Sequence, residues 1–125
     1  MKKFARHLAL AALALAAPLA VTAASAADYP AKPVTFVVPW PAGGSTDITG
    51  RMTASYMSNH LGQAIAVVNR VGGVGTIATR SVLDAPKDGY TVLVTTVGNH
   101  VLQPAVRDVG FLPRDFIPIG QISAR

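Results

Sequence analysis

From residue 34 onward, the hydrophobic positions of the chain follow two alternating patterns. The runs "VTFVV" (34–38), "AIAVVN" (64–69) and "YTVLVTT" (90–96) are short and rich in apolar and β-branched residues, which is typical of strands. The first has no polar face and is expected to be covered on both sides, as in a parallel sheet, and the second is expected to be buried. Between them, residues 46–61 and 76–85 have the length and composition of helices. The order βαβαβ predicts an α/β fold, half of a doubly wound domain.

The first of these helices has recognisable start and stop signals. Ser45 or Thr46 is expected to cap its first amides, and Asp47 suits the positive end of the helix dipole. Gly62 is expected at the C-cap, while Gly50 weakens the helix by about 1 kcal/mol relative to alanine. At helical spacing, one face of this helix carries Ile48, Met52, Ser55, Tyr56 and Asn59.

The pattern becomes irregular after the third strand. Residues 97–106 read as a loop with one helical turn. The segment "FIPIGQI" (116–122) is apolar enough for a fourth strand, and Pro118 would restrict that strand to an edge or a crossover.

The N-terminal residues have the three-part pattern of a secretory signal peptide. Three basic residues among the first six precede an uncharged apolar run at 8–20, and small residues follow. We expect a signal peptide over residues 1–26, cut after Ala26, with Ala27 as the near alternative. An uncleaved anchor is disfavoured because the apolar run is short for a membrane span. The mature part is then 27–125, a partial first α/β domain.

Charge and composition exclude several classes of protein. The full chain carries +5, but removal of the three basic leader residues leaves eight Lys and Arg against six Asp, or +2. The mature part has no basic run, so nucleic-acid binding is not expected. The chain has no cysteine, which excludes disulfides and thiolate metal sites. No His, Asp or Glu spacing matches a metal site either.

Two glycine-rich junctions carry the most chemical information. "PAGGSTD" (41–47) follows the first strand and "VGGVGT" (71–76) follows the second. Both place unobstructed backbone amides at a helix N-terminus, which binds carboxylate or phosphate without needing a lysine. Both lie at the carboxyl edge of the sheet, where open α/β sheets bind ligands.

Enzymatic alternatives are less well supported. Gly73-x-Gly75-x-x-Ala78 matches the dinucleotide fingerprint of a Rossmann-type enzyme, but no acidic residue ends the next strand. Ser45 lacks the G-x-S-x-G elbow of a hydrolase, and nothing supports His100 as its base. No lysine follows the glycines as in a Walker motif. We therefore expect no catalysis and no cofactor, and keep the nucleotide enzyme as the alternative.

With both glycine junctions in view, the chain resembles the tripartite tricarboxylate transporter substrate-binding proteins, also called the Bug family. The resemblance covers residues 29–125 and rests on an ordered set of motifs: "YPAKPV", "PWPAGGSTD", "LGQAIAVVNRVGG.G", "APKDGYTVLVTT" and "RDFIPIGQIS". It implies a periplasmic binding protein of type II-like fold, in which two α/β domains enclose a cleft.

The resemblance also implies a function. A small organic carboxylate, or a related small polar ligand, would be captured between the domains and passed to membrane transporter subunits. The receptor would be a monomer when complete. The chain stops at Arg125, near where family members cross into the second domain, so we expect a truncated member. A nonfunctional fragment is a further alternative.

The family's ligand loops map onto three segments of this chain. Val71 stands where members often have proline, and Thr76 and Ala78 stand where they often have asparagine and glycine. The expected ligand-binding residues are Trp40, Pro41, Ala42, Gly43, Gly44, Ser45, Thr46 and Asp47; Gly72, Gly73, Val74, Gly75 and Thr76; and Val97, Gly98, Asn99 and His100.

Residues near these loops are given structural roles. Asn69 is expected to order its turn rather than touch a ligand. Arg51 and Arg80 are expected to be solvated on their helices, away from the loops. Arg70, at the exit of the second strand, is expected to steer anions or to hold the loop.

Overall fold

The computed structural model describes residues 29–123. Three parallel strands form the sheet in the order β2-β1-β3: β1 is Val34–Val38, β2 is Ile65–Asn69 and β3 is Thr91–Leu93. In register, Val34 lies opposite Ile65, and Thr35 lies opposite Thr91. The predicted α/β order is confirmed. Residues 1–26, with the expected signal peptide, lie outside the described residues.

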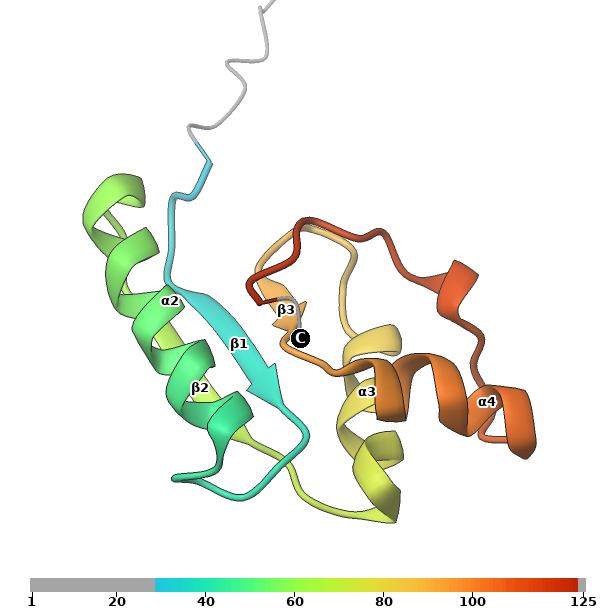
Figure 1. Ribbon diagram of the computed structural model, residues 1–125. Coiled ribbons are helices and arrows are strands. Elements are labelled where there is room, and N and C mark those ends of the chain that lie inside the picture. The colour runs from blue at the N-terminus through green and yellow to red at the C-terminus, as the bar shows by residue number, and fades with distance from the viewer. Residues whose placement is uncertain (1–28, 124–125) are drawn as a thin grey trace, which may run out of the picture.

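Two helices connect the strands (Figure 1). Helix α2 spans Ser45–Leu61 and helix α3 spans Thr76–Leu83. Gly62 ends α2 in a left-handed conformation, and its N–H donates to the carbonyl of Ser58 at 3.0 Å, as predicted. None of the helices described over residues 29–123 is long and apolar enough to cross a bilayer.

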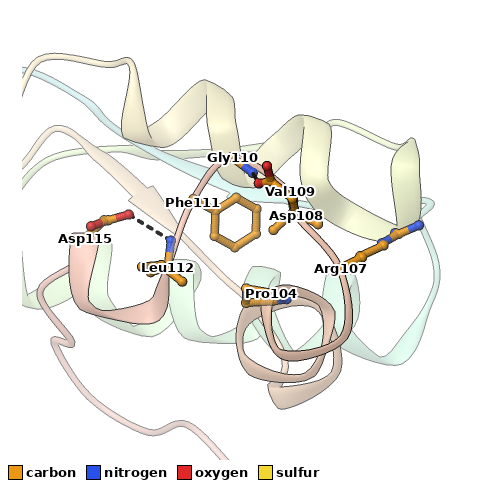
Figure 2. A pocket seen from close by; sticks show the side chains of 8 residues that line it. All are labelled: Pro104, Arg107, Asp108, Val109, Gly110, Phe111, Leu112 and Asp115. Carbon is orange, nitrogen blue, oxygen red and sulfur yellow. Dashed lines mark hydrogen bonds between the residues drawn. The ribbon is translucent and has the colours of Figure 1, made fainter.

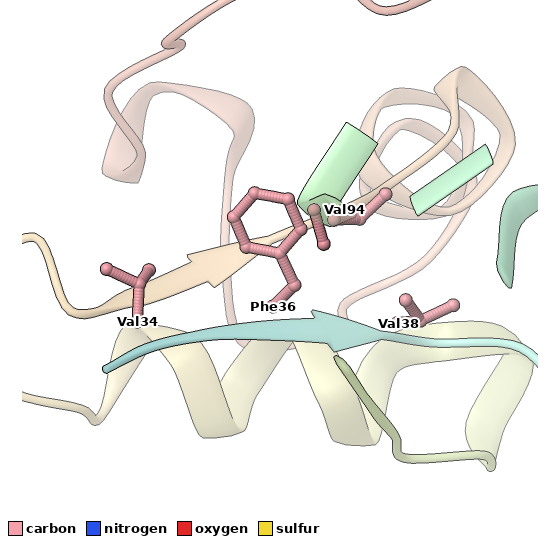
Figure 3. Close-up of a cluster of buried hydrophobic side chains, with 5 residues drawn as sticks. Val34, Phe36, Val38 and Val94 are labelled. Carbon is pink, nitrogen blue, oxygen red and sulfur yellow. The ribbon is translucent and has the colours of Figure 1, made fainter. Parts of the chain in front are cut away.

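The core lies between α2 and one face of the sheet. Alternate β1 residues Val34, Phe36 and Val38 are buried together with Val94 and with Ala54 of α2 (Figure 3). Gly50 also faces this core, and a Cβ there would make ordinary van der Waals contact, at 3.5 Å, with side-chain atoms of both Val38 and Val94. The helix therefore packs through its small residues.

The face of α2 that carries Ile48, Met52 and Tyr56 is not the face that packs on the sheet. Ile48, Met52 and Tyr56 do share one face, but they are exposed, Met52 by 70%. The buried residues of α2 are Asp47, Gly50 and Ala54. Small residues occupy the packed face of α2 because the helix lies close against the valine-rich sheet.

The last third of the chain differs from the expectation. Strand β3 is shorter than the predicted 90–96, and a π-helical turn Gly98–Leu102 runs into the short helix α4, Gln103–Val106. A 3₁₀ turn follows at Pro113–Asp115. The predicted strand at 116–122 is wrong, since this segment pairs with no strand in the described part of the chain and Ile117 is 90% exposed.

Candidate functional site

The three expected ligand loops begin at the same edge of the sheet. All three strands are parallel, so their carboxyl ends lie together (Figure 1). We call residues 40–47 the first loop, 72–76 the second loop and 97–100 the third loop. The predicted common edge, where open α/β sheets bind ligands, is confirmed.

The first loop leads into a helix end without a side-chain cap. Helix α2 begins at Ser45 after Gly44, and no side chain caps this N-terminus. The expected capping role of Ser45 or Thr46 is wrong, because both residues already lie inside the helix. Among residues 29–123, the N–H groups of Ser45, Thr46 and Asp47 have no hydrogen-bond acceptor. Such unpaired amides and the helix dipole together favour an anion.

Asp47 sits at the centre of a buried polar network just below this helix end. Its side chain is 3% exposed. Oδ2 accepts from the Gly43 N–H at 2.8 Å and from Arg51 Nε at 3.0 Å, while Oδ1 accepts from Asn69 Nδ2 at 2.8 Å. These bonds stabilise the charged form and lower the pKa of Asp47 to about 2, with the Arg51 bond as the largest cause. Because Arg51 neutralises Asp47, the carboxylate repels an approaching anion less.

We expect acid to weaken the fold through Asp47. Aspartate in an unfolded chain titrates near pKa ~3.9, whereas the folded value is about 2. A depressed pKa stabilises the native state fully above the unfolded value, and this contribution is lost as the pH falls through the folded value. Urea unfolding of wild type and Asp47→Asn between about pH 6 and pH 2 measures it. The variant should be less stable at pH 6 and less sensitive to acid.

Asp88 provides the control for this comparison. Its pKa is also lowered, mainly by the N–H of Tyr90, but its side chain is exposed on a turn far from the loops. Asp88→Asn should keep most of the acid sensitivity of the wild type. An Asp47→Asn profile parallel to the wild-type profile would show that Asp47 carries no such coupling.

Asn69 and Arg51 complete the network. Asn69 Nδ2 also donates to the carbonyl oxygen of Trp40 at 2.9 Å, and Arg51 Nη2 donates to Asn69 Oδ1 at 2.9 Å. Asn69 therefore has an ordering role, but its side chain holds the first loop rather than its own turn. Arg51 is exposed to solvent, as predicted, but the prediction that it lies away from the loops is wrong. Its spacing of four residues from Asp47 on one helix was the available signal.

The second loop has an unusual backbone. Gly73, Val74 and Gly75 all have positive φ, with Val74 at +54°. A β-branched residue in this region is a genuine outlier, and such strain is of the order of 1–3 kcal/mol. Val74 is half exposed at the tip, while Gly75 is buried. The Thr76 hydroxyl donates back to the carbonyl of Gly73 at 2.9 Å.

The third loop is fixed by a buried asparagine. The Asn99 side chain is fully buried, and its Oδ1 accepts from the Thr95 hydroxyl and from the Thr96 N–H. Asn99 Nδ2 donates to Thr79 Oγ1 at 3.2 Å, and that hydroxyl donates to the carbonyl of Gly75 at 2.9 Å. Asn99 is therefore placed to position the third loop against the second. Val97, in contrast, is exposed.

His100 lies in an aromatic cluster. Its ring is 5.0 Å from that of Phe116 and 6.5 Å from that of Phe111, between centroids. Burial lowers the pKa of His100, which favours the neutral ring. Its Nδ1 is buried without a hydrogen-bond partner in residues 29–123. The half-buried ring packs on the C-terminal segment.

Two side-chain amides therefore connect all three loops. Asn69 joins the first loop to the end of β2, where the chain enters the second loop. Asn99 joins the third loop to the second through Thr79. The remaining expected site residues lie around these bridges: Pro41, Ala42 and Gly43 are exposed, and Gly44, Gly72 and Gly98 are partly exposed.

Open hollows of about 390 and 410 Å³ lie on the surface of residues 29–123. The first hollow lies over the C-terminal segment around Phe111, where the Leu112 N–H donates to Asp115 Oδ2 at 2.8 Å (Figure 2). The second hollow includes Gly73 and Thr76 of the second loop. No residue of the first or third loop lines either hollow.

Comparison with known proteins identifies the relatives of this chain. No protein-family model matches it. A UPF0065 protein from the tcbD-tcbE intergenic region of Pseudomonas sp. (strain P51) is 38% identical over 122 residues, which is 91% of this chain and 34% of that protein. BugT of Bordetella pertussis is 40% identical over 87 residues, 70% of this chain and 25% of BugT.

Several solved structures are also similar to this chain. MatC of Rhodopseudomonas palustris, with bound malate, has a TM-score of 0.70 at 36% identity, over 73% of this chain and 32% of MatC. A second R. palustris protein, with adipate, gives 0.57 at 44% identity, over 58% and 24%. A TctC solute-binding protein from Polaromonas gives 0.50 at 42% identity, over 52% and 23%.

The chain is a Bug/TctC-like protein. The chain spans about a third of the length of the Pseudomonas relative. The predicted family is confirmed over this part, and the matched structures confirm the predicted fold. The neighbours of this Bug/TctC-like chain that hold malate and adipate are binding proteins for carboxylates.

Proposed function

We propose that this Bug/TctC-like chain forms one wall of a periplasmic receptor for a small organic carboxylate. Residues 1–26 would act as the cleaved export signal, and residues 27–125 would supply part of the first α/β domain. The complete receptor would be a monomer that delivers its ligand to the membrane subunits of a tripartite tricarboxylate-type transporter. The malate and adipate held by two structural neighbours support this class of ligand.

The uncapped start of α2 is the observation that carries this proposal. Three amides at the end of a 17-residue helix have no acceptor within residues 29–123. A carboxylate there would receive charge-assisted hydrogen bonds, each of about 1.5–3 kcal/mol. Arg51 already neutralises the one acidic side chain at this end. The second and third loops, including Gly72–Thr76 and Val97–His100, would form the neighbouring parts of the pocket.

A proline at the first helical position tests the role of these amides. Proline is well tolerated there, and Gly44, at φ −73° and ψ 163°, has the extended backbone that the residue before a proline requires. Ser45→Pro removes one free N–H while leaving the helix intact. We expect unchanged or slightly higher thermal stability and about tenfold weaker malate or adipate binding by calorimetry.

Ser55→Ala, on the exposed face of the same helix, is the matched control and should bind like the wild type. Equal affinity of Ser45→Pro and wild type would contradict binding at the start of α2. A wild-type chain that binds neither malate nor adipate would contradict the proposal for this chain.

A further inference from the structure

We propose that Arg80 and Arg107 form an additional oxyanion site beside the second loop. Both arginines line the hollow of about 410 Å³, together with Gly73, Thr76 and residues 108–110. The ligand class is a small anion with carboxylate or phosphate oxygens.

The two guanidinium groups reach the hollow from different elements. Arg80 lies in α3, and Arg107 follows the last residue of α4. Arg107 Nη2 donates to the carbonyl oxygen of Gly73 at 3.4 Å. A Cβ on Gly110 would lie only 2.6 Å from Arg80 Nη1, so glycine at this position leaves room for the guanidinium. The backbone of residues 73 and 110 thus places both charges in one hollow.

The charge balance of the hollow favours an anion. The ion pairs within residues 29–123 are Lys32–Asp88 and Asp47–Arg51, so neither Arg80 nor Arg107 has an acidic partner in this part of the chain. Asp108 is the one acid lining the hollow, and its Oδ1 accepts from the Gly110 N–H at 2.9 Å. The two guanidinium groups and the one carboxylate that line the hollow together carry a net charge of +1. The planar fork of arginine matches carboxylate and phosphate oxygens.

This site shares Gly73 and Thr76 with the proposed receptor pocket but differs from it in its other lining residues and in its donors. The first and third loops do not line it. Its donors are guanidinium groups rather than helix-end amides. The expectation that Arg80 lies away from the loops is accordingly wrong, because it shares a hollow with the second loop.

Titration of the chain with inorganic phosphate, and separately with malate, tests the inference. Arg80→Gln and Arg107→Gln should each weaken phosphate binding about tenfold in calorimetry at low salt, and added salt should weaken the wild type. Both side chains are exposed, so the variants should keep the wild-type circular dichroism spectrum. Arg114→Gln, an exposed arginine outside the hollow, is the matched control and should bind phosphate like the wild type.

The Ser45→Pro variant separates this site from the receptor site. Weaker phosphate binding in the two arginine variants, with phosphate binding intact in Ser45→Pro, supports the inference whatever the malate result. Malate binding that depends on Ser45 but not on Arg80 or Arg107, with no phosphate binding, overturns the inference and leaves the receptor proposal standing. An equal loss in Arg114→Gln overturns it as well, since that result indicates only unspecific charge attraction.

Discussion

Replacing Asn99 with alanine is expected to lower the free energy of unfolding by about 3 kcal/mol. The side chain is fully buried, and its two polar atoms bond with Thr95, Thr96 and Thr79. Its removal leaves the part-buried Thr96 N–H without a partner among residues 29–123, and an unsatisfied donor costs up to about 1–3 kcal/mol. Urea unfolding followed by circular dichroism measures the loss.

Asn59→Ala serves as the control, because Asn59 is an exposed asparagine on α2. That change should stay within about 0.5 kcal/mol of the wild type. Similar stabilities for the two variants would show that Asn99 is not the residue that fixes the third loop. If Asn99 instead contacts the ligand directly, Asn99→Ala should lose affinity while keeping its stability.

The position of Asn99 also shows how the three loops are held together. Two asparagines, each bonded to residues far away in sequence, hold the three loops in one arrangement. Such preorganisation saves a ligand the ordering cost of the loops on binding. The helix-end amides of α2 take no part in these two bridges, so in the proposed site positioning and binding are carried by different groups.

The main elements could be predicted because local pattern and packing agree. "VTFVV" has no polar face, and in the structure β1 is the central strand, with four of its five residues buried. Gly62 and the glycines after β1 and β2 mark element ends, which have strong local chemistry. The edge that carries the loops then follows from parallel strand order alone.

Other features depend on contacts that a linear pattern does not contain. Thr79 and Asn99 are 20 residues apart, and no periodicity connects them. The buried face of α2 was hidden because Gly50 and Ala54 are small rather than strongly hydrophobic. The apolar run 116–122 has strand-like composition, but a strand also needs a pairing partner, and none is present among the described residues.

Replacing Gly75 with alanine is the second change expected to be severe, with a loss of about 3–4 kcal/mol. Gly75 has φ +88°, where a Cβ alone costs about 1–2 kcal/mol. That Cβ would also lie 2.7 Å from Asn99 Nδ2 and 3.0 Å from Asn99 Cβ. Asn99 would have to move, and its bond to Thr79 would be lost. Urea unfolding of the variant measures the combined cost.

Gly43→Ala measures the cost of backbone strain without the steric clash that a Cβ on Gly75 makes with Asn99. Gly43 has nearly the same φ, +83°, but a Cβ there meets nothing within 4 Å. It should therefore cost only the ~1–2 kcal/mol of backbone strain. In the double variant Gly75→Ala/Asn99→Ala, the loss should fall short of the sum of the two single losses, because both changes break the same bridge. Strict additivity, or equal losses for Gly43→Ala and Gly75→Ala, would show that the second and third loops are not coupled through this contact.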